Sequence, residues 1–310
     1  FVSNAAILII LSQGSDPLQM QPYYEKVFDS VNQVEHDKSD KGKILAIKNI
    51  SGSDEERVKL AKVCLASGSI EVWLGKLVIE MQKTLKALCE TAAAQCAEMS
   101  LGDFVDANCA QFALLGIQFN WTAQCQEALE KAKQNKAIVQ DTNRQQLVVL
   151  QELSSWCLND LKTKMNRRKI ETLVTIHVHQ RDVFEDLARL HRSRKGGLDA
   201  GDFEWLKQAR FYWRPDAKDD HGPSACVVAV CDVEFTYSFE YLGCKERLVI
   251  TPLTDRCYIT LSQALGMHLG GAPAGPAGTG KTETVKDLGR ALGVFVVVTN
   301  CTDQQRYTDM

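Results

Sequence analysis

The amino-acid sequence predicts a mainly α-helical protein: a helical rod or bundle followed by a truncated α/β module. Three observations predict this class. Apolar residues recur at steps of three and four through most of residues 53–209, apolar alternation with a period of two follows residue 225, and eight of the 20 glycines fall within residues 266–293. The first pattern is typical of amphipathic helices and the second of strands, while clustered glycines indicate a backbone that turns sharply or closely approaches another group.

Composition places the chain among ordinary folded proteins of about two domains. Its 310 residues are 45% apolar and 24% charged, which excludes a disordered, collagenous or low-complexity chain. The formal charge of -3 gives no reason to expect nucleic acid or an anionic membrane surface as a partner. The longest apolar runs, residues 5–11 and 225–231, are far shorter than the about 18 residues of a membrane span, so no membrane segment is expected.

Cysteine usage and the two ends of the chain bear on its origin. Eleven cysteines are spread singly without a C-x-x-C pair, and a chain of this length needs no covalent staples, so we expect reduced thiols in a cytoplasmic protein. The first apolar run lacks a basic leader and a small-residue cleavage site, which argues against export. Because the chain begins at Phe1 and stops at Met310 soon after an apolar run, we expect a fragment of a longer protein.

Long helices are expected from Ser53 to Ala209. Ser53 and Glu56 have the spacing of a capping box, which predicts that a helix begins there, and Gly196 and Gly197 are expected to end the last helix. We interpret the apolar stripes as core packing without chemistry of their own. The stripes are Trp73, Leu74, Leu77, Val78, Met81, Leu85 and Leu88; Trp121, Cys125, Ala128 and Leu129; Leu147, Leu150, Leu153, Trp156, Cys157 and Leu161; and Leu173, Ile176, Val183, Leu187 and Leu190.

His177 and His179 are the one unusual pair in these helices. Residues two apart do not share a helix face, so their side chains are poorly placed to bind one metal ion together. We therefore favour packing or solvent-facing histidines over a metal site.

The pattern changes after the helices. Residues 213–223 are polar and rich in turn formers, which predicts a domain boundary or a tight connection. Two alternating runs then predict a pair of strands or a hairpin, and residues 248–250 form a further short apolar run that Thr251 and Pro252 end. The alternating residues are Cys226, Val228 and Val230, followed by Val233, Phe235, Tyr237 and Phe239.

The glycine cluster contains a phosphate-binding motif. Residues 275–282 match G-x-x-x-x-G-K-S/T without a mismatch, and they read Gly275, Pro276, Ala277, Gly278, Thr279, Gly280, Lys281 and Thr282. Glycines let successive backbone N–H groups point at phosphate oxygens, and a helix N-terminus favours an anion. Lys281 is expected to reach the β- and γ-phosphates and the Thr282 hydroxyl to bind Mg²⁺. Glu283, the next residue, is included in the candidate nucleotide-binding set.

The surroundings of the loop favour this interpretation over a purely structural glycine loop. Residues 282–292 are compatible with a helix, with Val285, Leu288, Ala291 and Leu292 on one side. Residues 294–298 form an all-apolar run that predicts a buried parallel strand. Residues 269–274, just before the loop, make a poor strand by propensity. The motif by itself indicates ATP or GTP.

Several stretches resemble dynein heavy chains. Residues 239–243 (Phe-Glu-Tyr-Leu-Gly), 247–258 (Arg-Leu-Val-Ile-Thr-Pro-Leu-Thr-Asp-Arg-Cys-Tyr) and 271–289 around the loop are similar to the first AAA+ module of that family. Residues 297–310 look most like the axonemal, outer-arm gamma type. Residues 1–4, 8–13, 51–58 and 72–74 are similar to the C-terminal part of the dynein linker. The resemblance divides the chain into linker, residues 1–236, and the start of the AAA+ module, residues 237–310.

The resemblance implies an ATP-driven, minus-end-directed microtubule motor that powers ciliary beating in the axoneme, with ATP and Mg²⁺ as cofactors. It implies the linker as lever, and as partners microtubules, dynein intermediate and light chains and the remaining AAA+ modules of the same heavy chain. It also implies a loop against adenine, although ordinary strand-end packing stays open for its apolar side chains. That tentative adenine pocket consists of Val249, Ile250, Pro252, Leu253 and Thr254.

Hydrolysis requires more than a phosphate cradle. An acidic residue behind the metal, a group that positions water and commonly an arginine finger are needed, and the sequence identifies none of them, so no catalytic residue is assigned. We expect the parent protein to be the ATPase and this chain to bind nucleotide weakly with negligible turnover. Two alternatives stay open, a non-dynein AAA+ NTPase and a helical scaffold with a vestigial loop. Residues 252–255 argue against the first, and intact Lys281 and Thr282 argue against the second.

Overall fold

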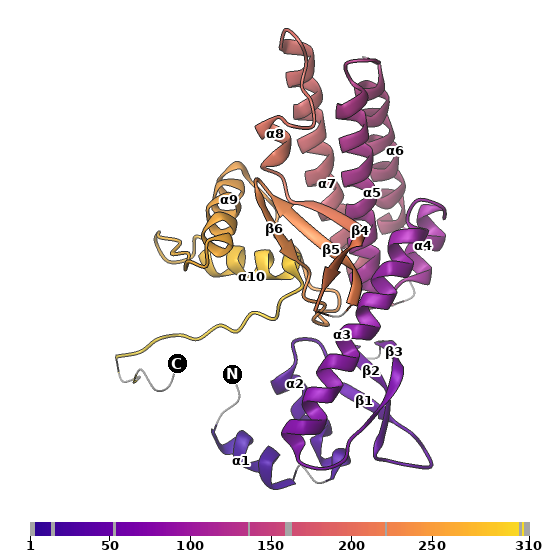
Figure 1. Ribbon diagram of the computed structural model, residues 1–310, viewed down its shortest axis with the longest axis vertical. Coiled ribbons are helices and arrows are strands. Elements are labelled where there is room, and N and C mark those ends of the chain that lie inside the picture. The colour runs from indigo at the N-terminus through magenta and orange to yellow at the C-terminus, as the bar shows by residue number, and fades with distance from the viewer. Residues whose placement is uncertain are drawn as a thin grey trace.

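The computed structural model describes residues 4–13, 16–51, 54–135, 137–158, 163–220, 222–303 and 306. Helices dominate these residues and two three-stranded antiparallel sheets complete them, which confirms a mainly α chain. Figure 1 shows an elongated molecule with the first sheet at one end and the ends of long helices at the other. None of the helices in the described part of the chain is long and apolar enough to cross a membrane.

The N-terminal end is a small α/β unit. Helix α1 (Asn4–Gln13), the 3₁₀ helix η1 (Pro17–Tyr23) and α2 (Tyr24–Val27) precede the sheet β1 (Gln33–His36), β2 (Lys43–Ser51) and β3 (Asp54–Leu65), in the order β1-β2-β3. The helix predicted to begin at Ser53 is wrong, because Glu56 pairs with Asn49 of β2 within a strand. Val58 and Leu60 are buried while Arg57 and Lys59 are exposed, so burial alternates residue by residue as in a strand, in spite of the capping signal. Ser53 itself lies outside the described residues.

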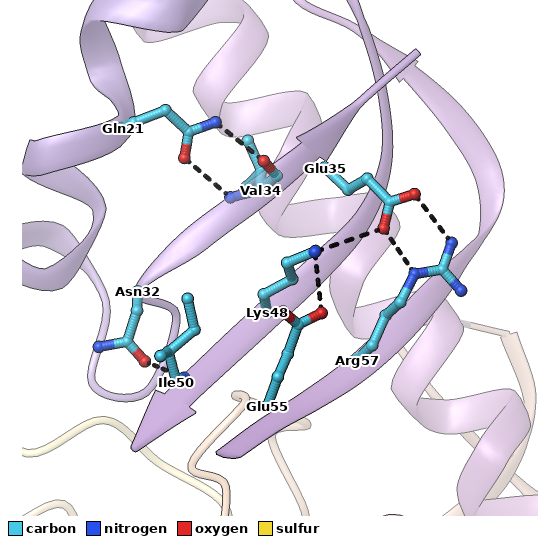
Figure 2. Close-up of polar contacts among 8 residues, drawn as sticks. All are labelled: Gln21, Asn32, Val34, Glu35, Lys48, Ile50, Glu55 and Arg57. Atoms are coloured by element: carbon cyan, nitrogen blue, oxygen red, sulfur yellow. Dashed lines mark hydrogen bonds and ion pairs between the residues drawn. The ribbon is translucent and has the colours of Figure 1, made fainter. Parts of the chain in front are cut away.

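Polar side chains fasten this sheet, as Figure 2 shows. The Gln21 amide donates to Val34 O (2.8 Å) and accepts from Val34 N (3.1 Å), so a side chain takes the place of a neighbouring strand at the β1 edge. Lys48 bridges Glu55 (2.8 Å) and Glu35 (3.9 Å), and Arg57 Nε donates to the same Glu35 at 2.5 Å. These charge pairs cross from β1 to β2 and β3 on the exposed face and favour this strand order.

Five helices follow: α3 (Ile70–Gln95), α4 (Leu101–Ala107), α5 (Ala110–Lys131), α6 (Ile138–Leu158) and α7 (Lys164–Ser193). The predicted stripes of α3, α5 and α7 face the interior, and α7 ends three residues before Gly196. The stripe predicted for α6 is partly wrong: Leu153 is buried, but Leu147 is exposed. Its buried face instead contains Val139, Thr142 and Gln146, because polar residues there bond to α5 and α7; Leu161 lies outside the described residues.

The second sheet lies in the middle of the molecule. After α8 (Phe203–Leu206) come β4 (Arg210–Asp219), β5 (Gly222–Val230) and β6 (Val233–Thr236), in the order β4-β5-β6. The predicted hairpin is confirmed by β5 and β6. Residues 213–223 do contain a tight connection, between β4 and β5. Strand β4 runs through most of them, which the sequence pattern does not indicate. The pairing register of β4 shifts between Arg214 and Lys218, the stretch that contains Pro215.

The C-terminal part packs on the other side of this sheet. Helices α9 (Pro252–Gly266) and α10 (Lys281–Leu292) lie opposite α5 and α7 across β4–β6 (Figure 1). The strand predicted over residues 294–298 is wrong: no strand pairs with this segment among the described residues, and Val297 is 50% exposed. An apolar run becomes a parallel strand only beside a hydrogen-bonding neighbour. In Figure 1 the segment instead extends away from α10.

Residues 237–244 join the two parts of the chain. They form neither helix nor strand, yet Tyr237, Phe239 and Tyr241 are buried in the same apolar core as α3, α5 and α10. A second apolar core gathers around Trp121, Phe184 and Trp205. All eleven cysteines are free thiols.

Candidate phosphate-binding site

The loop of residues 275–282 has an open backbone conformation. Gly278 and Gly280 have φ of +77° and +78°, in the left-handed region that favours glycine. A Cβ atom at either position would meet nothing within 4 Å, so conformation and not crowding requires glycine there. Residues 269–280 are all exposed, which leaves the loop accessible to a ligand.

Lys281 lies at the centre of the loop. It is the first residue of α10, and its Nζ donates to Gly275 O (2.8 Å), to Pro276 O and to Thr279 Oγ1 (3.3 Å). The Thr279 hydroxyl donates to Pro276 O at 2.9 Å. The Lys281 side chain therefore folds back over the loop and closes a ring with loop oxygens. A phosphate would replace these oxygens as the acceptors of the ammonium group, which is the one side-chain cation within residues 275–282.

The start of α10 is also available to an anion. Gly280 is the N-cap and offers no side-chain cap, so the first N–H groups of the helix lack a capping side chain. The exposed Thr282 hydroxyl has no hydrogen bond among the described residues. Glu283 pairs with Lys286 at 2.8 Å, and this hydrogen bond lowers the pKa of Glu283. The hydrogen bond of Glu283 is thus made along the helix, to a residue outside the loop.

Residues 249–254, the tentative adenine segment, lie around the start of α9. Val249 and Leu253 are 70% and 71% exposed. Pro252 is the first helical residue, and Thr254 forms a capping box with Thr251, whose N–H donates to Thr254 Oγ1 at 2.6 Å. Ile250 and Pro252 line a groove of about 500 Å³ between α7, α8 and α9. The apolar run therefore leads into a helix start and does not continue as a strand.

One buried residue connects this segment with α10. Asp287 is 0% exposed and accepts from Arg247 Nε (2.7 Å), Arg247 Nη2 (3.2 Å), Leu248 N (3.1 Å) and the Tyr258 hydroxyl. Sequence reasoning did not identify this cluster. The available signal was an aspartate beside Leu288 on the buried side of α10, where Thr284 and Ala291 also lie. Val285, predicted for that side, is 36% exposed.

Electrostatics keep the cluster charged. Burial raises the pKa of Asp287, but the charge and hydrogen bonds of Arg247 and the donors Tyr258 and Leu248 outweigh burial, so its pKa lies below the ordinary range. Burial and then the neighbouring Asp287 charge raise the pKa of Tyr258. At neutral pH the cluster thus consists of the Asp287 carboxylate, the Arg247 guanidinium and the neutral phenol of Tyr258.

The two histidines do not form a joint metal site. His177 is buried, with Nε2 donating to Gln146 O (3.1 Å) and Nδ1 near Gln180 Oε1 (3.3 Å). His179 instead lines the groove beside Asp255. In the described part of the chain, no three His, Cys, Asp or Glu side chains are grouped so as to hold a metal ion. An ion that enters with a nucleotide would have the Thr282 hydroxyl as its protein ligand.

Comparisons with known proteins find dynein family models and dynein relatives. A family model described as the hydrolytic ATP binding site of the dynein motor region matches residues 237–310, and one described as dynein heavy chain, N-terminal region 2, matches residues 1–92. The chain is 48% identical over 305 residues to the flagellar outer-arm dynein gamma chain of Chlamydomonas reinhardtii. It is 48% identical over 310 residues to dynein axonemal heavy chain 5 of Rattus norvegicus and 46% over 309 residues to dynein axonemal heavy chain 8 of Homo sapiens.

These alignments cover 98–99% of this chain but only 6–8% of the relatives. The chain therefore spans less than a tenth of the length of the proteins it resembles.

Proposed function

The chain belongs to the axonemal dynein heavy chain family, and we propose that it forms the part of the motor where a lever meets the main nucleotide site. In this proposal, residues 275–282 bind the phosphates of Mg-ATP, and residues 1–236 are the C-terminal part of the linker, the lever of minus-end-directed movement. Residues 237–310 are the start of the first AAA+ module.

The observation that carries the proposal is the ring that Lys281 closes at the start of α10. Residues 275–282 combine an ammonium group, glycines with positive φ and a helix N-terminus without a capping side chain. These are the groups that polyphosphate binding requires. Bound Mg²⁺ would neutralise phosphate charge, with Thr282 as its protein ligand. The match of residues 237–310 to a hydrolytic ATP site supports ATP as the nucleotide.

Mechanical coupling rests on the buried connection between lever and module. Gln111 of α5 donates to Tyr237 Oη (2.9 Å) and Glu240 O (2.8 Å) and accepts from Leu242 N (3.0 Å). On the other side, Ser238 N donates to Leu292 O (3.1 Å) and Glu240 N to Gly293 O (3.1 Å), at the C-terminal end of α10.

Further contacts hold the same connection from the N-terminal unit. The Tyr241 hydroxyl donates to Glu56 Oε2 at 2.5 Å, and the Ser30 hydroxyl donates to Leu242 O at 2.8 Å. Because residues 237–242 bond to α5, β3 and α10 at once, we propose that a displacement of α10 moves the helical region with it as a rigid body and is not absorbed at this connection.

We assign nucleotide binding to this chain and hydrolysis to the complete motor. The two carboxylates of α10 have other partners, since Glu283 pairs with Lys286 and Asp287 with Arg247. Neither is placed to activate water at the loop, so turnover by this chain is expected to be negligible. The exposed apolar side chains of residues 249–254 support a role against adenine, which Val249, Ile250, Pro252, Leu253 and Thr254 would share.

Location and partners of the whole motor follow from its relatives. They include a flagellar outer-arm chain and axonemal heavy chains, which supports a cytoplasmic motor in the axoneme of a cilium or flagellum. The complete heavy chain would act on microtubules, together with dynein intermediate and light chains and the other AAA+ modules.

Titration of a fluorescent ATP with Mg²⁺ tests the proposed nucleotide site. Lys281→Ala is expected to lower affinity more than tenfold, about 1.4 kcal/mol, because it removes the ammonium from the loop. Lys286→Ala, a matched change on the exposed side of the same helix, should bind like the unaltered chain. Thr282→Ala should bind equally with Mg²⁺ and with a chelator. Equal binding by the chain and its Lys281→Ala variant would favour the scaffold alternative.

A further inference from the structure

Asp287 of α10 collects donors from two other segments, residues 247–248 and α9, on one buried carboxylate. The guanidinium of Arg247 approaches both of its oxygens, the backbone N–H of Leu248 reaches Oδ1, and the Tyr258 hydroxyl reaches Oδ2. The Asp287 side chain is fully buried and that of Arg247 is 13% exposed. Holding a carboxylate away from water is favourable only with such complete pairing.

The three segments have distinct places relative to the candidate site. Asp287 is six residues after Lys281 on α10, a rise of about 9 Å along the helix axis. Arg247 and Leu248 immediately precede the tentative adenine segment, and Tyr258 lies on α9, which begins within that segment. The carboxylate therefore links α10 directly to residues on either side of the segment 249–254, next to a second bond from Arg290 to Glu246 O (2.9 Å).

No other role in the site accounts for this aspartate. It is buried, so it offers no free oxygen to a metal ion or a water molecule, and its charge is neutralised by Arg247. Its effect on a ligand must pass through the backbone that it holds, above all through the Leu248 N–H. The Leu248 bond fixes the backbone directly before Val249, whose side chain is exposed.

We propose that Asp287 is a positioning residue for the nucleotide, which sets the base-contacting segment at a fixed distance from the phosphate-binding loop. This rests on the proposed function. Phosphate binding depends on residues 275–282 and does not need the clamp, whereas adenosine binding needs residues 249–254 in their place. Loss of the clamp therefore weakens the part of ATP affinity that comes from adenosine and leaves the phosphate part unchanged.

The test compares two ligands by isothermal titration calorimetry, Mg-ATP and Mg-tripolyphosphate, which has the phosphates without adenosine. In Asp287→Asn we expect ATP affinity to fall about tenfold, equivalent to about 1.4 kcal/mol, with tripolyphosphate affinity within about twofold of the unaltered chain. Tyr258→Phe, which removes one donor, should show the same selectivity with a smaller loss. Lys281→Ala should weaken both ligands alike.

A second variant addresses folding. Asp287→Asn removes the charge but keeps an oxygen acceptor for the Leu248 N–H. Arg247→Met combined with Asp287→Leu removes both charges, leaves no unpaired ion in the core and deletes that acceptor, so it also serves if Asp287→Asn does not fold by circular dichroism. The same loss of ATP affinity without loss of tripolyphosphate affinity is expected.

The outcomes separate the two claims. Equal losses for both ligands in the clamp variants would overturn the positioning role and leave a merely structural aspartate, as would unchanged ATP affinity. If the unaltered chain binds neither ligand, the proposed function itself fails, and the positioning role fails with it.

Discussion

At the residue scale, the phosphate loop depends on backbone conformations that only glycine adopts without strain. Gly278 and Gly280 both have positive φ, and neither position is crowded by neighbouring atoms. Gly280 also lies directly before Lys281, so its conformation sets the direction in which the first turn of α10 leaves the loop. Substitutions here probe conformation separately from packing.

Gly280→Ala is expected to lower the free energy of unfolding by about 1 kcal/mol, because a Cβ in the left-handed region is strained even where space is open. Gly280→Asn should recover part of the loss, since asparagine tolerates that region. Gly270→Ala is the matched control, at an open position without positive φ. Urea denaturation measures all three, and equal midpoints for Gly280→Ala and Gly270→Ala would contradict the conformational argument.

Gln111 offers a second residue-scale prediction. Its amide makes three hydrogen bonds to residues 237–242, so Gln111→Leu leaves a buried carbonyl and a buried N–H unsatisfied. We expect a loss of about 3 kcal/mol in unfolding free energy. Gln118→Leu is the control, because that equally buried amide donates only to Leu114 O of its own helix, and its loss should be about 1 kcal/mol.

Hydrogen exchange gives the same prediction a local readout. The Leu242 amide should exchange faster in Gln111→Leu and not in Gln118→Leu. Equal losses of stability in the two variants, with no change at Leu242, would mean that Gln111 does not hold the connection.

At the element scale, the pairing of α6 with α7 depends on a neutral histidine. Burial lowers the pKa of His177, and Arg181 lowers it further, while the bonds to Gln146 and Gln180 act in the opposite direction. The unfolded chain takes up a proton near pH 6.5, where the folded chain does not. Stability from this site is therefore complete above about pH 6.5 and declines as the pH falls toward the lower folded pKa.

We accordingly expect the melting temperature to fall between about pH 7.5 and about pH 5.5, and to fall less steeply in His177→Gln. His268→Asn, at an exposed histidine, should keep the slope of the unaltered chain. Scanning calorimetry across this range measures the slope. A His177→Gln slope equal to that of the unaltered chain would contradict this, because it would show that His177 takes up protons alike in the folded and unfolded chains.

Elements with strong periodicity were predictable, and those set by distant partners were not. Helices α3, α7 and α10 follow their apolar patterns because each buries one regular face. The second half of α5 and the β5–β6 hairpin follow their patterns too, although residues 110–119 of α5 and 224–230 of β5 are buried throughout. For β3 the local capping signal of Ser53 and Glu56 predicts a helix, whereas the pairing of the strand with β2 decides its conformation. Residues 294–298 have the composition of a buried strand without a paired neighbour in the described part of the chain.

The same contrast separates the two parts of the candidate site. The phosphate loop is contiguous, so residues 275–282 carry the whole signal. The Asp287 clamp joins residues 29–40 positions apart through polar contacts, which leave no period in the sequence. The hydrogen bonds of Gln111 join residues 126–131 positions apart and likewise leave no pattern in the sequence.

At the scale of the whole molecule, the proposed function places a lever and a phosphate-binding site on opposite sides of one central sheet. Figure 1 places α9 and α10 against the central sheet, with the long helices on its far side. Residues 237–244 cross between them within the main apolar core. The division at residue 236 is therefore a division of function proposed from the family, within a single packed structure.

The most direct test follows one sample of γ-³²P-labelled ATP, mixed with Mg²⁺ and an excess of the chain, for both retention on the protein and release of phosphate. The account predicts that ATP is retained intact by the chain and by Lys286→Ala and is lost from Lys281→Ala, with negligible phosphate released. Absence of retained ATP, or steady phosphate release that Lys281→Ala abolishes, would contradict it.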